Sequence, residues 1–215
     1  MGRVEVLRNP LAQSVLTYLR DERTGYREFR GLLELAGVLE AYEFSRYLPV
    51  KEVTVRTPLS VKAKGVEVKD DETTIVAVMR AALPFAYGML RVLPRARLGV
   101  VAAKRIEYEN ALDKNFEMEV EVPYINLPVN SGVLVLADPM LATGSTLKKV
   151  IELIRGRAEY EKLIVASVVS TELGIRRVWE AEPEAVVFTL AIDKELNEKA
   201  YIVPGLGDAG DRAFG

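Results

Sequence analysis

Cysteine and histidine are both absent from this chain of 215 residues. The absence of cysteine excludes disulfide bonds, thiolate nucleophiles and zinc sites built from cysteine. The absence of histidine removes the side chain that most often serves as a general base or as a metal ligand. Any catalysis by this chain must therefore use carboxylates, lysine, tyrosine, backbone groups or charges carried by the ligand.

Long apolar runs and an excess of positive charge are also missing. No apolar run approaches the roughly 18–20 residues that span a bilayer, and the N-terminal stretch "MGRVEVLRNP" lacks the apolar core of a signal peptide. We therefore expect a cytoplasmic protein without a membrane partner. The formal net charge of −2 leaves no surplus of basic residues to follow a nucleic-acid backbone, so nucleic acid is not an expected partner.

The order of the hydrophobic patterns predicts an α/β fold. Residues 10–48 have the apolar spacing of two amphipathic helices. Residues 75–79 and 133–136 are apolar runs of strand length, and each comes before a stretch with helical spacing. Because strands alternate with helices, we expect a single domain over residues 1–215, built on a wound, mainly parallel sheet flanked by helices.

Three segments depart from this alternation. In residues 51–70, apolar and polar residues alternate on both sides of a "TPLS" turn, which predicts a β-hairpin arm. Its exposed edges favour pairing with another subunit, so we expect a homo-oligomer, either a dimer or a tetramer. Residues 106–127 are polar and lie between apolar strands, which predicts a flexible lid. Residues 201–215 are rich in glycine and predict no regular structure, although they include apolar residues to bury.

Chemically useful residues follow directly after the apolar runs. Ligands of wound sheets bind at the carboxyl ends of the strands, so these residues are the first candidates for a site. Arginines, one carboxylate and a hydroxyl-rich turn suit a phosphate-bearing ligand with a divalent cation better than an apolar ligand. The candidates are Arg80, Lys104, Arg105, residues 138–146, Ser170 and Thr171.

The turn "ATGST" at residues 142–146 has the composition of a phosphate site. A helix that begins after Gly144 exposes backbone N–H groups at the positive end of its dipole, and Gly144 lets a ligand approach the backbone closely. Thr143, Ser145 and Thr146 add hydroxyl donors. The alternative is that these hydroxyls only cap the helix, and the turn by itself leaves both interpretations open.

Two other nucleotide-binding motifs do not apply. The GxxxxGK[ST] spacing of a Walker loop is missing from the sequence. The stretch "GLGDAG" at residues 205–210 matches the dinucleotide fingerprint GxGxxG, but we expect neither a strand before it nor a helix after it. We therefore treat this match as a false positive.

Three stretches together resemble the uracil phosphoribosyltransferases, which belong to the type I phosphoribosyltransferases. "LADPMLATGST" resembles the motif of that family that binds 5-phospho-α-D-ribose 1-diphosphate (PRPP), and "VMRAALPF" resembles its arginine-bearing segment. The tail "YIVPGLGDAGDRAFG" resembles the uracil-binding C-terminus of the family. The resemblance covers roughly residues 20–215. It implies a type I fold with a C-terminal hood over the base, and the conversion of uracil and PRPP to UMP and diphosphate in pyrimidine salvage.

The resemblance also assigns roles to residues. Asp138 would meet the ribose hydroxyls and residues 142–146 the 5-phosphate, while Mg²⁺ would be held mainly by PRPP, with no metal site on the protein. Catalysis would depend on Arg80, Arg105 and Asp208. Uracil would contact Ile202, Gly207, Asp208 and Ala209. The full PRPP set is Arg80, Arg105, Asp138, Pro139, Met140, Leu141, Ala142, Thr143, Gly144, Ser145, Thr146 and Asp208.

Some features differ from the family pattern or leave alternatives open. Ser145 stands where the family usually has glycine, and "RAALPF" replaces the commoner RAGLGM. Some archaeal members bind GTP as an activator, and Arg27 and Arg30 are the candidates for such an effector site here. Two alternatives to a uracil enzyme are a nucleotide sensor or RNA-binding regulator with the same fold, and a phosphoribosyltransferase for another base. The tail and the near-neutral charge favour uracil.

Overall fold

The computed structural model describes residues 2–106, 118–128 and 131–215. The helices are α1 (Pro10–Arg20), α2 (Tyr26–Phe44), α3 (Ala82–Val92), α4 (Ser145–Arg155), α5 (Glu172–Ala181) and α6 (Ala209–Phe214), with 3₁₀ turns η1 (Ser45–Tyr47) and η2 (Asp70–Glu72). The strands are β1 (Arg3–Val6), β2 (Val50–Arg56), β3 (Lys62–Val68), β4 (Thr73–Met79), β5 (Arg97–Arg105), β6 (Val120–Asn126), β7 (Ser131–Ala137), β8 (Met140–Leu141), β9 (Tyr160–Thr171), β10 (Val186–Asp193), β11 (Glu195–Leu196) and β12 (Ile202–Val203).

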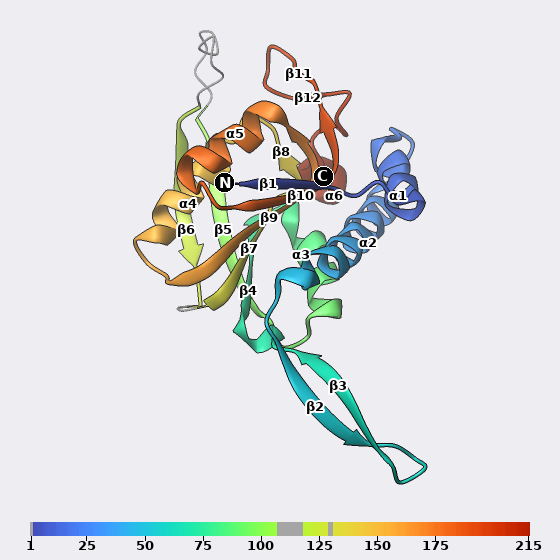
Figure 1. The fold of residues 1–215 in the computed structure, drawn as a ribbon. Coiled ribbons are helices and arrows are strands. Elements are labelled where there is room, and N and C mark those ends of the chain that lie inside the picture. Colours follow the sequence, from blue (N-terminus) through green and yellow to red (C-terminus); the bar gives the residue numbers. More distant parts are fainter. Residues whose placement is uncertain (1, 107–117, 129–130) are drawn as a thin grey trace.

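A central sheet with the strand order β1-β10-β9-β7-β4-β5-β6 organises the chain, and the short strand β8 pairs with β9 (Figure 1). The strands pair in parallel except at β5 and β6, which are antiparallel. The prediction of a wound, mainly parallel sheet flanked by helices is therefore confirmed. Within the described ranges, no helix combines the length and the apolar character needed to cross a bilayer.

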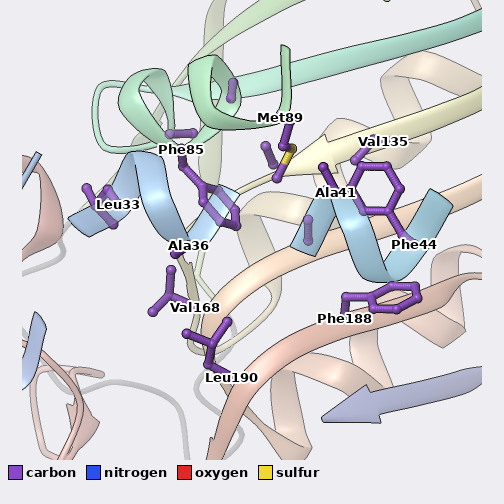
Figure 2. Packing of buried hydrophobic residues seen from close by; sticks show 14 of the residues in the cluster. Leu33, Ala36, Ala41, Phe44, Phe85, Met89, Val135, Val168, Phe188 and Leu190 are labelled. Carbon is purple, nitrogen blue, oxygen red and sulfur yellow. The ribbon is translucent and has the colours of Figure 1, made fainter. Parts of the chain in front are cut away.

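Helices cover both faces of the sheet, so successive residues of a central strand enter different cores. Ile75 and Ala77 of β4 pack with α1, α2 and α3, whereas Val76 and Val78 pack with α4 and α5. Strands buried on both faces have continuous apolar sequences, which is why this part of the sequence indicated a parallel sheet. On the first face, the rings of Phe44 and Phe188 meet edge to face with their centroids 6.1 Å apart (Figure 2).

The predicted hairpin is confirmed, because β2 and β3 pair in antiparallel register and project from the body of the protein (Figure 1). Arg95 fixes its base. The guanidinium donates to the Asp70 carboxylate at 2.7 Å, to Glu67 at 2.8 Å and to the Val68 carbonyl at 2.8 Å. The root of the arm is thus held to the body, while the tip extends into solvent.

Two predicted segments differ from expectation. Residues 120–126, which fall within the predicted lid, form the edge strand β6, while residues 107–117 lie outside the described residues. The lid itself stays a prediction. The tail was expected to lack regular structure, but it contains β12 and the helix α6.

The tail helix has a local cause. The Asp208 carboxylate accepts a hydrogen bond from the Asp211 backbone N–H at 2.9 Å, which is an N-cap, and Ala209 and Ala213 are buried. The expectation that no helix follows "GLGDAG" was therefore wrong, since an N-cap and two buried alanines suffice for a short helix. The expectation that no strand precedes the match was also wrong, because β12 ends at Val203. β12 pairs with β11 and not with the central sheet, so it does not form the first strand of a dinucleotide-binding unit.

Glu40 of α2 is fully buried, and this burial raises the pKa of its carboxyl well above the usual value, while the backbone N–H of Ser167 acts in the opposite direction. The folded protein therefore keeps a proton on Glu40 at pH values where the unfolded chain has lost it. Above the unfolded pKa of about 4.3, stability then falls with pH by up to about 1.4 kcal/mol per unit until the folded pKa is reached.

We expect Glu40→Gln to remove this term, because the amide keeps the shape of the protonated acid and does not ionise. The free energy of unfolding of the variant, minus that of the wild type, should rise with pH above the pKa of the unfolded chain and level off once the folded carboxyl ionises. Guanidinium unfolding at a series of pH values measures this difference. A difference that stays constant across the series would contradict the assignment.

Candidate functional site

A cleft of about 260 Å³ lies beyond the carboxyl ends of β4 and β7. Three segments that are far apart in the sequence line it, namely residues 78–81, residues 138–147 and residues 200–211. Most of the residues predicted for the site are brought together here. Those that line the cleft are Arg80, Asp138, Met140, Leu141, Ala142, Thr143, Gly144, Thr146, Ile202, Gly207, Asp208 and Ala209.

Five of the candidate residues are not among those that line the cleft, namely Lys104, Pro139, Ser145, Ser170 and Thr171. Pro139 is buried behind it. Arg105 ends strand β5, whose neighbour β4 leads into the cleft, and its side chain lies outside the described residues. Ser145 is 7% exposed, and its hydroxyl accepts a hydrogen bond from the buried guanidinium of Arg177 at 3.1 Å. Ser145 therefore does not line the cleft, since Arg177 holds its hydroxyl on the side of α5, and a role for this hydroxyl as a donor to a ligand stays a prediction.

The 142–146 turn depends on a close contact with α5. Gly144 has φ +79° and precedes the first residue of α4. A Cβ atom at this position would lie 2.8 Å from the Gly174 carbonyl oxygen, so both its torsion and the packing require glycine. Thr146 and Leu147 of the first turn of α4 line the cleft, which therefore lies at the positive end of this helix, as an anion site requires.

Asp138 follows β7 and is half-buried at the wall of the cleft. Its backbone N–H continues the sheet by donating to the Ala166 carbonyl at 3.0 Å. Its carboxylate accepts from the Met140 N–H at 3.3 Å. These two bonds fix the direction in which the carboxylate enters the cleft.

Arg80 connects the end of β4 with the tail across the cleft. Its guanidinium donates to the Asp211 carboxylate at 3.1 Å and to the Gly215 carbonyl at 3.4 Å. The side chain is 57% exposed, so this ion pair contributes little to stability and can exchange for another anion. The peptide bond between Met79 and Arg80 is cis.

A partly buried ion pair fixes the start of the tail. Arg20 of α1 meets the carboxylate of Asp193, at the end of β10, through two hydrogen bonds of 2.8 Å. The same two side chains bind the Gly205 backbone, since Asp193 accepts its N–H and Arg20 donates to its carbonyl, both at 2.9 Å. Sequence reasoning missed this pair, although Asp193 follows an apolar run in the same way as Asp138.

Two further arginines hold α6 and the loop before it. Arg212 donates to the carbonyls of Leu19, Leu206 and Asp21, and its guanidinium lies 4.3 Å from the centre of the Phe29 ring. Burial lowers the pKa of Arg212 from its ordinary value. Arg30 donates to a carbonyl in the last turn of α6 at 2.6 Å, so it supports the tail whether or not it also contacts an effector.

Comparison with known proteins agrees with this arrangement. A sequence model of the family described as "Uracil phosphoribosyltransferase" matches residues 6–215. The chain is 45% identical over 214 residues to a protein from Pyrobaculum islandicum named uracil phosphoribosyltransferase, and the match covers 98% of each chain.

Solved structures support the same relationship at the level of the fold. The chain superposes on a protein from Aquifex aeolicus with a TM-score of 0.86, at 30% identity, over 98% of this chain and 97% of the other. An adenine phosphoribosyl transferase from Trypanosoma brucei has a TM-score of 0.54 at 12% identity, over 88% and 82% of the two chains, and shares the fold only. On the match over nearly its whole length, the chain belongs to the uracil phosphoribosyltransferase family, whose members are pentosyl transferases that make UMP from uracil and PRPP.

Proposed function

We propose that the cleft binds PRPP and uracil side by side and transfers the phosphoribosyl group between them. One observation carries this proposal: residues 78–81, 138–147 and 200–211 line a single cavity. The resemblance of the sequence to the family implies that the first segment contacts the pyrophosphate, the second the ribose phosphate and the third the base. Their convergence supports one reaction centre over three separate ligand sites.

PRPP would lie along the loop after β7. The 5-phosphate would meet the backbone N–H groups of the 142–146 turn at the positive end of α4. Asp138 would accept hydrogen bonds from the ribose hydroxyls. Arg80, whose ion pair with Asp211 is exposed, and Arg105 would turn to the pyrophosphate, which is a better acceptor than one carboxylate.

Uracil would bind to the backbone of the tail between Ile202 and Ala209. Its imide edge presents a fixed order of acceptor, donor and acceptor, which a rigid stretch of backbone can match. Gly205 and Gly207 have positive φ angles. Arg20 and Asp193 fix the loop through their hydrogen bonds to the Gly205 backbone. A cytosine would leave buried groups unpaired, at a cost of about 1–3 kcal/mol for each.

In the reaction, the bond between the anomeric carbon and the pyrophosphate oxygen breaks and a bond to the uracil nitrogen forms, while the proton released by this nitrogen passes to the departing pyrophosphate or to water. Positive charge develops on the ribose, and negative charge develops on the leaving group. Arg80 and Arg105 would stabilise the leaving group by charge, with hydrogen bonds already directed at it. This reaction does not require a histidine as general base, which agrees with the absence of histidine from the sequence.

The residues of the cleft fit a Mg²⁺ ion that arrives with PRPP. In the described part of the chain, no three His, Cys, Asp or Glu residues gather as they would around a metal. The carboxylates of Asp138 and Asp208 line the cleft from opposite segments. Mg²⁺ favours phosphate oxygens and water over an all-protein cage, and when bound it would neutralise charge on the pyrophosphate. A GTP effector near Arg27 stays a prediction.

The choice of base separates this proposal from its alternatives. We expect pyrophosphate release from PRPP and Mg²⁺ with uracil, and at least about 100-fold slower release with cytosine or hypoxanthine, because each unpaired buried group costs about 1–3 kcal/mol. A coupled pyrophosphate assay measures all three. If none of the three bases gives pyrophosphate release, the result would support the alternative of a nucleotide sensor or RNA-binding regulator. Pyrophosphate release with hypoxanthine alone would support a phosphoribosyltransferase for another base.

Asp208→Asn tests the charge of Asp208 separately from its role in the tail helix. The amide oxygen can still accept the Asp211 N–H, so the N-cap and the melting temperature should persist. We expect turnover to fall by about 100-fold or more, as for other groups that contact the reacting atoms. Glu198→Gln, which removes an exposed carboxylate outside the cleft, is the matched control. Near-normal turnover by Asp208→Asn would remove the carboxylate from the reaction.

We also propose that the hairpin arm joins two copies of this chain. Beyond the Lys51–Glu67 pair at the root of the arm, the strand register places Val53, Val55, Ala63 and Gly65 on one face, called the apolar face here. The opposite face is mixed, with Glu52, Thr54, Arg56, Lys62 and Lys64 beside Val66. An extended apolar face on a projecting arm favours a protein partner over solvent, and a second copy offers the same surface to a symmetric contact.

Val55→Lys should weaken this contact, because a charge would enter the apolar face. Thr54→Lys, which adds the same charge to the opposite face, should leave assembly unchanged. Sedimentation velocity on both variants and the wild type measures the outcome. A wild-type monomer, or equal sedimentation of the two variants, would refute the role of this face.

A further inference from the structure

Helix α5 holds two carbonyl groups of the 142–146 turn from the side opposite the cleft. The Thr171 hydroxyl, at the N-cap of α5, donates to the Ala142 carbonyl at 2.6 Å. The guanidinium of Arg177 donates to the Thr143 carbonyl at 2.8 Å. Arg177 is 6% exposed, so a buried charge lies directly behind the turn.

These two bonds determine where the neighbouring amides point. In a trans peptide, the C=O and the N–H of one plane point in opposite directions. When the carbonyls of Ala142 and Thr143 are bound toward α5, the N–H groups of Thr143 and Gly144 face away from α5, toward the cleft that both residues line. Neither N–H has a hydrogen-bond partner within the described residues, so both are available to an anion.

Ser145 completes the arrangement behind the turn. Its hydroxyl oxygen accepts from Arg177 at 3.1 Å and from the Thr143 hydroxyl at 3.1 Å. It also accepts from the backbone N–H of Met118, next to β6, at 3.3 Å. A glycine here would leave the guanidinium without this second acceptor, which gives the departure from the family pattern a physical reason.

We propose that Arg177 is a positioning residue for the phosphate site, acting with Ser145 and Thr171. It does not touch the ligand. Arg177 fixes the Thr143–Gly144 peptide and Thr171 fixes the Ala142–Thr143 peptide, so that the N–H groups of Gly144 and Thr143 meet the 5-phosphate without reorganisation. This inference rests on the proposed assignment of the 142–146 turn to the 5-phosphate.

Calorimetric titration with ribose 5-phosphate and, separately, with pyrophosphate tests the inference. We expect Arg177→Met to raise the Kd for ribose 5-phosphate by about tenfold or more, since a misdirected N–H loses the free energy of one charged hydrogen bond. The Kd for pyrophosphate should stay within about twofold, because Arg80 binds it independently of the turn. Arg177→Lys should recover part of the lost affinity for ribose 5-phosphate, because lysine keeps a charged donor but lacks the planar set of N–H donors of the guanidinium.

Two further variants make the outcomes distinct. Arg176→Ala, which removes the exposed arginine next in sequence, should change neither affinity. Thr146→Ala alters the cleft side of the turn and should weaken ribose 5-phosphate binding if the turn holds the phosphate. If Thr146→Ala weakens binding while both Arg177 variants leave it unchanged, the positioning role is wrong.

The remaining outcomes are equally decisive. If Thr146→Ala and both Arg177 variants leave the affinity unchanged, the phosphate assignment fails, and the inference fails with it. If Arg177→Lys folds with the wild-type melting temperature but loses both ligands equally, Arg177 does not act on the phosphate site selectively. Selective loss of ribose 5-phosphate by the folded Arg177→Lys variant supports the proposal even where Arg177→Met does not fold.

Discussion

Burial of the central strands on both faces is the constraint from which the site follows. Strands β4, β7 and β9 alternate their side chains between two hydrophobic cores, so polar groups can enter only where the strands end. Because these strands run parallel, their carboxyl ends meet at one edge of the sheet. Arg80 and Asp138 therefore become neighbours at one cleft, although 57 other residues separate them in the chain.

The cleft is completed by backbone groups whose direction is fixed by arginines, of which Arg177 is buried and Arg20 and Arg212 are half-buried. Arg20 and Arg212 hold the carbonyls of the tail, and Arg177 holds a carbonyl of the 142–146 turn. A buried guanidinium is costly without acceptors, so each arginine restricts the backbone that satisfies it. A chain without histidine can in this way present N–H groups and carbonyls to charged ligands in a rigid arrangement.

The sheet, its helices and the hairpin could be predicted because their patterns are local. The alternation of apolar and polar residues in 51–70 indicates a strand from a few neighbouring residues. The apolar runs at 75–79 and 133–136 indicate buried strands in the same local way. Most of the residues that line the cleft were likewise identified from the PRPP-like motif and the tail motif. The tail helix was missed because the glycine content outweighed the N-cap signal of Asp208, which the sequence does contain.

Contacts between distant residues could not be predicted. Nothing near Arg20 indicates that it pairs with Asp193, and Arg177 lies 32 positions from Ser145. The Ser145 hydroxyl was assigned to the ligand because Ser145 lies in the hydroxyl-rich turn at residues 142–146. The orientation of a hydroxyl depends on what packs behind the turn, and that depends on how α5 returns to the sheet.

We propose that three separate segments form one site for a ribose phosphate and a base. A crystal structure with UMP, which carries both groups in one molecule, tests this arrangement. We expect the phosphate within hydrogen-bond distance of the Gly144 N–H and the uracil ring against residues 202–209. A UMP molecule bound outside this cleft, or with its phosphate at the tail and its base at the 142–146 turn, would contradict it.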